Sequence, residues 1–107
     1  MIDPTSSATL HFTKEGEFSL SGALTFVSVS NLWRKKKTYF AKSNRIVLDL
    51  GKVIHSDSAG LALLVEWLHQ AEIRNAIIEF RNIPQQMLSL ARTAGIESLL
   101  ETPEQRN

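Results

Sequence analysis

One stretch of the chain limits its possible folds more than any other: an apolar strand, a short turn and the start of a helix, all within residues 46–61. Residues 46–50 are almost all apolar, which is typical of a central strand covered on both faces. Ser58 follows the turn and precedes apolar residues at helical spacing. At the start of a helix, backbone N–H groups lack intrahelical partners. Ser58 therefore either caps the helix or presents its oxygen to another molecule, as a contact point or a phosphorylation site.

Length and charge limit the class of protein. With 107 residues, 43% of them hydrophobic, the chain has room for one domain with one modest core. A formal net charge of +1 gives no general attraction to nucleic acid, and the absence of cysteine excludes disulfides and thiolate metal sites. No apolar run approaches the ~20 residues that span a bilayer, and the N-terminus lacks the pattern of a signal peptide. We therefore expect a cytoplasmic protein.

The periodicity along the rest of the chain predicts alternating strands and helices. Apolar and polar residues alternate in two short segments, and spacings of three and four predict helices elsewhere. We expect strands near 10–12, 18–20, 46–50 and 77–80, and helices over 26–40, 58–74 and 84–94. The first helix is expected to be amphipathic, because its spacings of three and four join Phe26, Val29, Trp33, Lys36 and Phe40 in one stripe. This order predicts the α/β class, with a mixed β-sheet packed against crossover α-helices.

The helix expected over 58–74 has apolar residues on more than one side. A core-facing stripe gathers Leu61, Leu64, Val65, Leu68 and Ala71. Leu63 falls on the opposite side, where it would form a small exposed apolar surface with Ala59, Ala62 and Glu66, about one turn from Ser58. An apolar patch beside a helix start is a plausible docking site, although single exposed leucines are also normal on a soluble surface. Both interpretations stay open at this point.

Catalysis and metal binding are disfavoured. His55, Asp57 and Ser58 resemble a nucleophile elbow, but Ser56 stands where the Gly-x-Ser-x-Gly motif needs its first glycine, and three adjacent groups rarely converge as a triad. The histidines at positions 11, 55 and 69 show no ligand spacing, and there is no phosphate-binding loop. We therefore expect no enzyme, no catalytic residues, no metal and no cofactor.

A basic run, Arg34-Lys-Lys-Lys37, falls late in the first predicted helix. Cations near a helix C-terminus interact favourably with the helix dipole, so a solvated helical face is the simplest interpretation. An electrostatic contact with anionic lipid or an acidic protein surface is the alternative. Nucleic acid is disfavoured because no aromatic platform accompanies the run.

The residues around the turn resemble the signature of the STAS family, the domain shared by sulfate transporters and anti-sigma-factor antagonists. That signature ends a central strand with an acidic residue, Ser or Thr, a small residue, Gly and Leu, and residues 57–61 read Asp-Ser-Ala-Gly-Leu. The predicted order of strands and helices agrees with the family over nearly the whole chain. The resemblance implies a single STAS domain over residues 1–107, with flexible ends at 1–7 and 102–107.

Two branches of the family compete. Anti-sigma-factor antagonists commonly continue Gly-Leu-Gly, whereas residues 60–64 read Gly-Leu-Ala-Leu-Leu, which is similar to the MlaB-like branch. Residues 20–24 and Leu32-Trp33 are similar to that branch too, although it more often has Thr at position 58 and Gly at position 59. Members of the branch are small cytoplasmic subunits of the Mla phospholipid-transport ABC complex of Gram-negative bacteria, which maintains outer-membrane lipid asymmetry.

The MlaB-like resemblance implies a non-enzymatic accessory subunit, peripheral to the inner membrane through its partners. Those partners would be an ABC ATPase subunit of the MlaF type and, through it, the permease complex, with no nucleic acid and no direct membrane insertion. Asp57 would orient the turn and Ser58 would be the central polar contact. The expected partner-binding residues are Asp57, Ser58, Ala59, Gly60, Ala62, Leu63 and Glu66. The alternative is an anti-sigma-factor antagonist switched by phosphorylation of Ser58.

Overall fold

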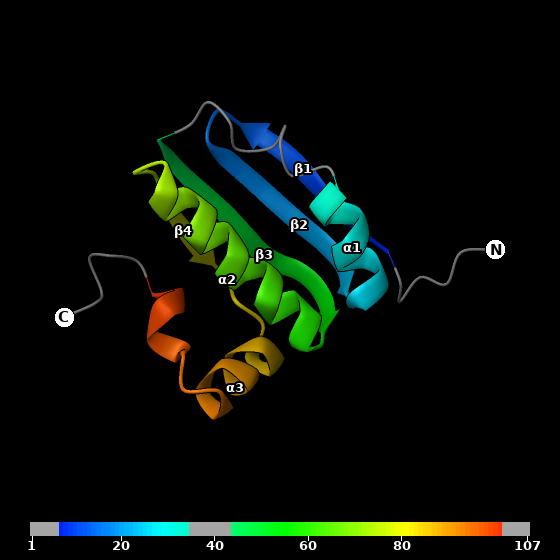
Figure 1. Cartoon of the computed structure of the whole chain (residues 1–107). Coiled ribbons are helices and arrows are strands. Elements are labelled where there is room, and N and C mark those ends of the chain that lie inside the picture. Colours follow the sequence, from blue (N-terminus) through cyan, green and yellow to red (C-terminus); the bar gives the residue numbers. More distant parts are fainter. Residues whose placement is uncertain (1–6, 35–43, 102–107) are drawn as a thin grey trace.

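The computed structural model describes residues 7–34 and 44–101 and shows one sheet with helices packed on it (Figure 1). The strands are β1 (Ala8–Lys14), β2 (Glu17–Leu24), β3 (Arg45–Ser56) and β4 (Ile77–Arg81), side by side in the order β1-β2-β3-β4. β1 is antiparallel to β2, whereas β2, β3 and β4 are mutually parallel. The helices are α1 (Phe26–Arg34), α2 (Ser58–Ile73), α3 (Gln85–Thr93) and the short 3₁₀ helix η3 (Glu97–Leu100). The predicted α/β class with a mixed sheet is confirmed.

Several sequence predictions fall on residues that the structure does not describe. These are residues 35–40 of the expected first helix, most of the basic run, and the expected flexible ends apart from Ser7. The carbonyl of Ser7 accepts a hydrogen bond of 2.9 Å from the backbone N–H of Ala23. The described part of the chain contains no helix long and apolar enough to cross a membrane.

β3 is longer than the sequence predicts. Its apolar run ends at Leu50, but the strand continues to Ser56 because residues beyond Gly51 pair with β2, as in the partners Leu24 and Ser56. The register shifts twice along this pairing, and the second shift leaves Ile54 without a register partner. Irregularities of this kind bend a strand locally, and here they lie next to the turn into α2.

α1 turns a different side to the core than the sequence predicts. Val29 and Trp33 of the predicted stripe do pack against the core, but Phe26 of the same stripe is 76% exposed, whereas Leu32, outside the stripe, is buried. Ser28 is also buried, and its hydroxyl donates to the carbonyl of Ala23 at 2.6 Å while accepting from the backbone N–H of Thr25 at 2.9 Å. These bonds satisfy the hydroxyl of Ser28 in the interior of the domain. α1 therefore turns the side with Ser28 and Leu32 to the core, and Phe26 faces outward.

α2 is likewise rotated relative to the prediction. Its buried residues follow helical spacing and include two that the predicted stripe lacks, Leu63 and Trp67. Val65 and Leu68, expected to face the core, are only half-buried. Leu63 is 2% exposed and belongs to the main core, so the expected exposed patch around it is wrong. The reason is that α2 contacts α1, α3, η3, β3 and β4, which cover it on more than one side.

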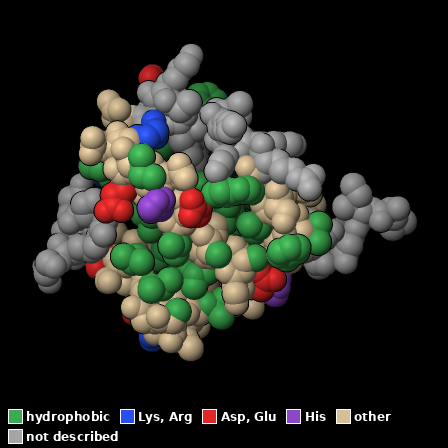
Figure 2. Space-filling view, in the orientation of Figure 1, with side chains coloured by type: hydrophobic (Ala, Val, Ile, Leu, Met, Phe, Trp, Pro, Cys, Tyr) green, Lys and Arg blue, Asp and Glu red, His purple; other side chains and the backbone are tan. Residues whose placement is uncertain are grey.

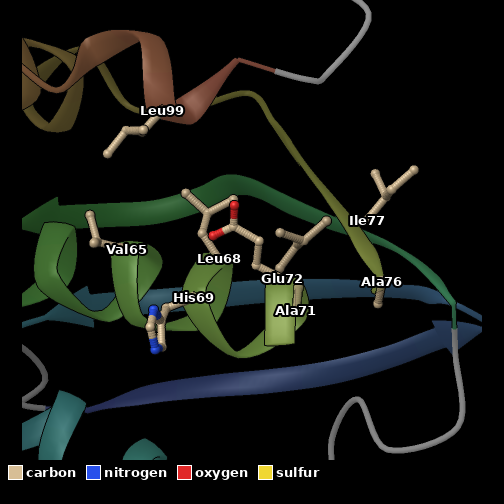
Figure 3. Close-up of a pocket in the computed structure, with 9 residues that line it drawn as sticks. Val65, Leu68, His69, Ala71, Glu72, Ala76, Ile77 and Leu99 are labelled. Atoms are coloured by element: carbon tan, nitrogen blue, oxygen red, sulfur yellow. The ribbon is translucent and has the colours of Figure 1, made fainter. Parts of the chain in front are cut away.

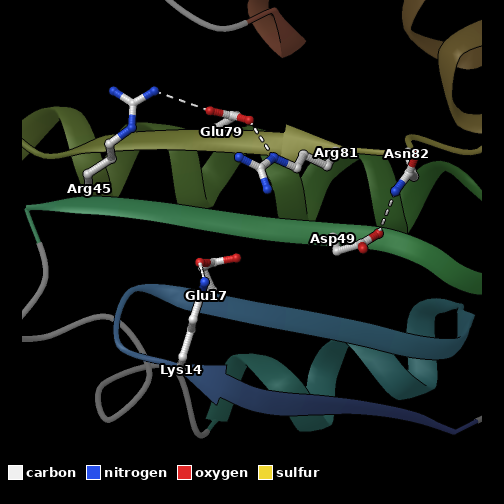
Figure 4. Close-up of polar contacts among 7 residues, drawn as sticks. All are labelled: Lys14, Glu17, Arg45, Asp49, Glu79, Arg81 and Asn82. Atoms are coloured by element: carbon white, nitrogen blue, oxygen red, sulfur yellow. Dashed lines mark hydrogen bonds and ion pairs between the residues drawn. The ribbon is translucent and has the colours of Figure 1, made fainter.

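The face of the sheet opposite α1 and α2 is polar and balances its own charges (Figure 4). Glu79 lies between two arginines and accepts from Arg81 Nε at 2.6 Å and from Arg45 at 3.2 Å. The hydrogen bond from Arg81, with the help of Arg45, holds the pKa of Glu79 below its ordinary value. The pKa of Asp49 is lowered in the same way, by hydrogen bonds from the side chain of Asn82 and the backbone N–H of Gly51. These charged groups are already satisfied within the chain.

Candidate binding surface at the start of α2

The starts of three helices meet at one edge of the sheet. β2, β3 and β4 are parallel and run toward this edge, where β2 and β3 end together at Leu24 and Ser56, whereas β4 ends earlier, opposite Asp49. α1, α2 and α3 begin near the ends of β2 and β3 (Figure 1). The backbone N–H of Asp57 donates to the carbonyl of Leu24 at 3.1 Å, which joins the end of β2 to the turn before α2. The backbone N–H of Ser56 donates to Oε1 of Gln86 at 3.0 Å, which joins the same turn to α3. The turn is therefore held from both sides.

Asp57 is the N-cap of α2. Its backbone is extended, and its Oδ1 accepts a hydrogen bond of 2.8 Å from the backbone N–H of Ala59. This bond attaches the turn to the start of the helix, and it excludes one of the two roles that the sequence left open for Ser58, that of the cap. Since Asp57 satisfies the free backbone donor, Ser58 is the first helical residue and not the cap.

Ser58 begins an outward-facing stripe. It is exposed, and its hydroxyl makes no hydrogen bond to any residue in the described ranges. Ala62 lies one turn further and is also exposed, and Glu66 lies one turn beyond that and is half-buried. Gln70 Nε2 donates to the Glu66 carboxylate at 3.0 Å and fixes its position. The stripe thus offers a hydroxyl, a small apolar residue and a carboxylate on one helical face.

Gly60 and Leu63 are directed into the protein instead. A Cβ atom at position 60 would overlap Oγ of Ser56 and would lie 2.8 Å from Cβ of Leu24. Gly60 therefore allows α2 to pack closely against the ends of β2 and β3. The close approach that Gly60 permits is one within the domain and not one with a partner. Neither Gly60 nor Leu63 is available to a partner. Ala59, another of the expected partner-binding residues, is half-buried.

Sequence reasoning missed three exposed apolar residues at the same edge. Phe26 and Val27 begin α1 and are 76% and 54% exposed, and Ile54, near the end of β3, is 73% exposed. Figure 2 shows that the helix-bearing face carries many hydrophobic side chains and few basic ones among the residues it describes. The sequence does contain one sign of this exposure, because Phe26 and Val27 are adjacent and both apolar. A helix cannot bury both of them on the side that also buries Ser28 and Leu32.

The histidine and carboxylate near Ser58 do not form a catalytic arrangement in the described chain. His55 is exposed and has no hydrogen bond to Asp57 or Ser58 there, and the Asp57 carboxylate is directed to the helix backbone. Ser56 is buried and donates to the carbonyl of Asp57 at 3.1 Å. Within residues 7–34 and 44–101, no group of three or more His, Asp or Glu side chains is placed to hold a metal.

The chain was compared with models of protein families and with curated proteins. The model of the family described as "Mlab, STAS domain" matches residues 10–101, a range that includes the whole turn and all of α2. A comparison with curated proteins found no match.

Proposed function

The chain belongs to the MlaB-like STAS domain family, and from that membership we propose that it is a non-enzymatic accessory subunit of an ABC phospholipid-transport complex of the Mla type. In this role it binds the MlaF-like ATPase subunit, supports its assembly and activity, and reaches the permease only through it. The protein is then cytoplasmic and peripheral to the inner membrane, and the complex maintains outer-membrane lipid asymmetry.

The observation that carries this proposal is the free hydroxyl of Ser58. It is exposed at the first position of α2 while the neighbouring carboxylate of Asp57 caps the helix. A serine that neither caps nor bonds within the described chain can serve an intermolecular contact at little cost to stability.

The surroundings of Ser58 suit a protein partner. Ala62 presents almost no side chain and permits close packing, and Phe26 and Ile54 supply apolar area at the same edge of the sheet. Protein interfaces combine an apolar centre with a polar margin, and Glu66 would stand at such a margin. The opposite face of the sheet, with its internally satisfied charges, is less suited to this purpose.

The proposal is tested by affinity purification of the tagged protein from its native host, followed by mass spectrometry. Wild type should recover an ABC ATPase and its permease, and Ser58→Arg should lose both because the long cation blocks close packing. Thr93→Arg is the matched control, since Thr93 is exposed near the end of α3, far along the chain from this surface. Loss of the ATPase with both variants, or with neither, would contradict the proposed surface.

The second candidate function is that of an anti-sigma-factor antagonist. The same exposed hydroxyl favours it, because a kinase needs an accessible serine. Phosphate would add about −1.5 to −2 charges at a helix start that tolerates anions, so the domain should stay folded while a closely packed partner is released. Recovery of a serine kinase or an anti-sigma factor in the purification, without an ABC ATPase, would support this function and exclude the first.

A further inference from the structure

A second surface lies at the other end of α2, away from Ser58. A groove of about 380 Å³ runs between the C-terminal half of α2, the start of β4 and η3 (Figure 3). We call it the α2–β4 groove. Most of its lining is apolar, and the residues that line it are Val65, Leu68, His69, Ala71, Glu72, Ala76, Ile77, Ile78 and Leu99.

Among residues 7–34 and 44–101, no element covers the apolar walls of the groove completely. Leu68 is half-buried on α2, and Ile77 and Leu99 are each 37% exposed on β4 and η3. In Figure 3, Leu99 extends from η3 on one side, with Leu68 on α2 on the other. Val65 and Leu68, which the sequence pattern predicts to be core residues, are therefore apolar residues that the described part of the chain covers only in part.

A single acidic side chain distinguishes this groove from an ordinary surface hollow. Of its lining residues, the titratable ones are His69 and Glu72. Within the described chain, the Glu72 carboxylate forms no ion pair and accepts no hydrogen bond. Val65, Leu68 and Glu72 share one helical side, since they are spaced by three and then four residues, over roughly 10 Å of helix. Apolar area and an unpaired negative charge therefore lie in one line.

We propose that the α2–β4 groove binds a short amphipathic segment of a partner protein, with apolar side chains against Leu68 and Leu99 and a Lys or Arg paired with Glu72. Charge complementarity selects this occupant. An anionic lipid would bring negative charge to the same carboxylate, and a purely apolar segment would offer it no partner. The protein then has two binding surfaces on α2, one at each end, and can connect two partners. This proposal does not depend on the identity of the partner at Ser58.

The test uses the full chain and a displayed library of random peptides, selected on wild type. Enriched peptides should combine apolar residues at spacings of three and four with at least one Lys or Arg. In NMR titrations they should shift the signals of Leu68, Ile77 and Leu99. Glu72→Lys should weaken the enriched peptides about tenfold, by replacing an attraction with a repulsion. Glu15→Lys makes the same charge change in the β1–β2 turn and should leave binding unchanged.

Three results would overturn the proposal. The first is enrichment of peptides without basic residues, or of peptides that bind Glu72→Lys as well as wild type. The second is a failure of every enriched peptide to shift the groove signals, or no enrichment at all. The third is concentration-dependent self-association of wild type that Glu72→Lys abolishes, which would assign the groove to a second copy of this chain. Because no ATPase is present, none of these results bears on the surface at Ser58.

Discussion

Oδ1 of Asp57 accepts a hydrogen bond of 2.8 Å from the backbone N–H of Ala59. This bond assigns helix capping to Asp57 and leaves the hydroxyl of Ser58 exposed at the first helical position. Under the proposed function, stability and partner contact are carried by two adjacent residues, and substitutions can separate them.

The first prediction concerns this separation. Asp57→Ala should lower the free energy of unfolding by about 1 kcal/mol because the backbone N–H of Ala59 loses its partner, and Asp57→Asn should retain most of the stability. Ser58→Ala should change it by no more than about 0.5 kcal/mol. Urea denaturation of the three variants measures this. A loss for Ser58→Ala as large as that for Asp57→Ala would show that Ser58 has a capping role after all.

Gly60 gives the second prediction. At an exposed helical site, Gly→Ala stabilises by up to about 1 kcal/mol, but Gly60→Ala should destabilise by about 1–3 kcal/mol. The added methyl group would overlap Oγ of Ser56 and press on Leu24. In a Ser56→Ala background, Gly60→Ala should lower the free energy of unfolding by less, because Oγ of Ser56 is no longer in the way. A double-mutant cycle gives the interaction energy between positions 56 and 60. A gain of stability in Gly60→Ala would refute the close packing.

Leu63 and its neighbour Ala62 provide the third prediction. Leu63→Ala should cost about 2–5 kcal/mol, as expected of a leucine buried in the main core. Ala62→Ser, on the exposed side of the same turn, should be nearly neutral. Thermal and urea unfolding would show the difference. Equal and small effects at both positions would restore the interpretation of Leu63 as a surface residue.

The fourth prediction is acid sensitivity from the polar face of the sheet. Glu79 and Asp49 have pKa values below the ordinary 4.5 and 3.8, through hydrogen bonds from Arg81 and Asn82 respectively. A carboxyl whose pKa is lowered by folding stabilises the protein above its unfolded pKa, and that contribution disappears as the pH falls through the folded pKa. The free energy of unfolding should therefore decline below about pH 4.5.

Urea midpoints measured from pH 7 downward would test this decline, with Glu79→Gln as the comparison. The variant should lose less stability than wild type over the acid range because it has no carboxyl to protonate at that position. An identical acid dependence in the two proteins would mean that the pair of Arg81 and Glu79 contributes nothing to it.

The order of elements was predictable because periodicity reports which sides of a segment are apolar. The number and order of the strands, the class of sheet and the extent of α2 follow from it directly, but the full length of β3 does not. Periodicity does not show which neighbouring elements will pack on a helix or on which sides. α2 is apolar on several sides, so its rotation depends on where it packs most closely, and that is decided by the missing side chain at Gly60 beside Leu24 and Ser56.

Tertiary contacts also account for the differences between the predicted and the observed α1 and β3. Ser28 was not expected to be buried, because its suitability for the interior depends on hydrogen bonds to Ala23 and Thr25 that no periodicity shows. The extension of β3 beyond Leu50 depends on pairing with β2 across two register shifts. Both features are decided by tertiary contacts, and together they place Phe26 and Ile54 at the exposed edge.

The most direct test of the account is the affinity of the purified protein for the Mla-type ABC ATPase of its own host, measured by calorimetry for wild type, Ala62→Arg and Ser58→Asp. Wild type should bind, and both variants should remain folded with unchanged melting temperatures but lose most of the affinity, whereas Thr93→Arg should bind like wild type. Full binding by a folded Ala62→Arg and a folded Ser58→Asp would contradict the claim that the exposed start of α2 is the surface that meets the ATPase.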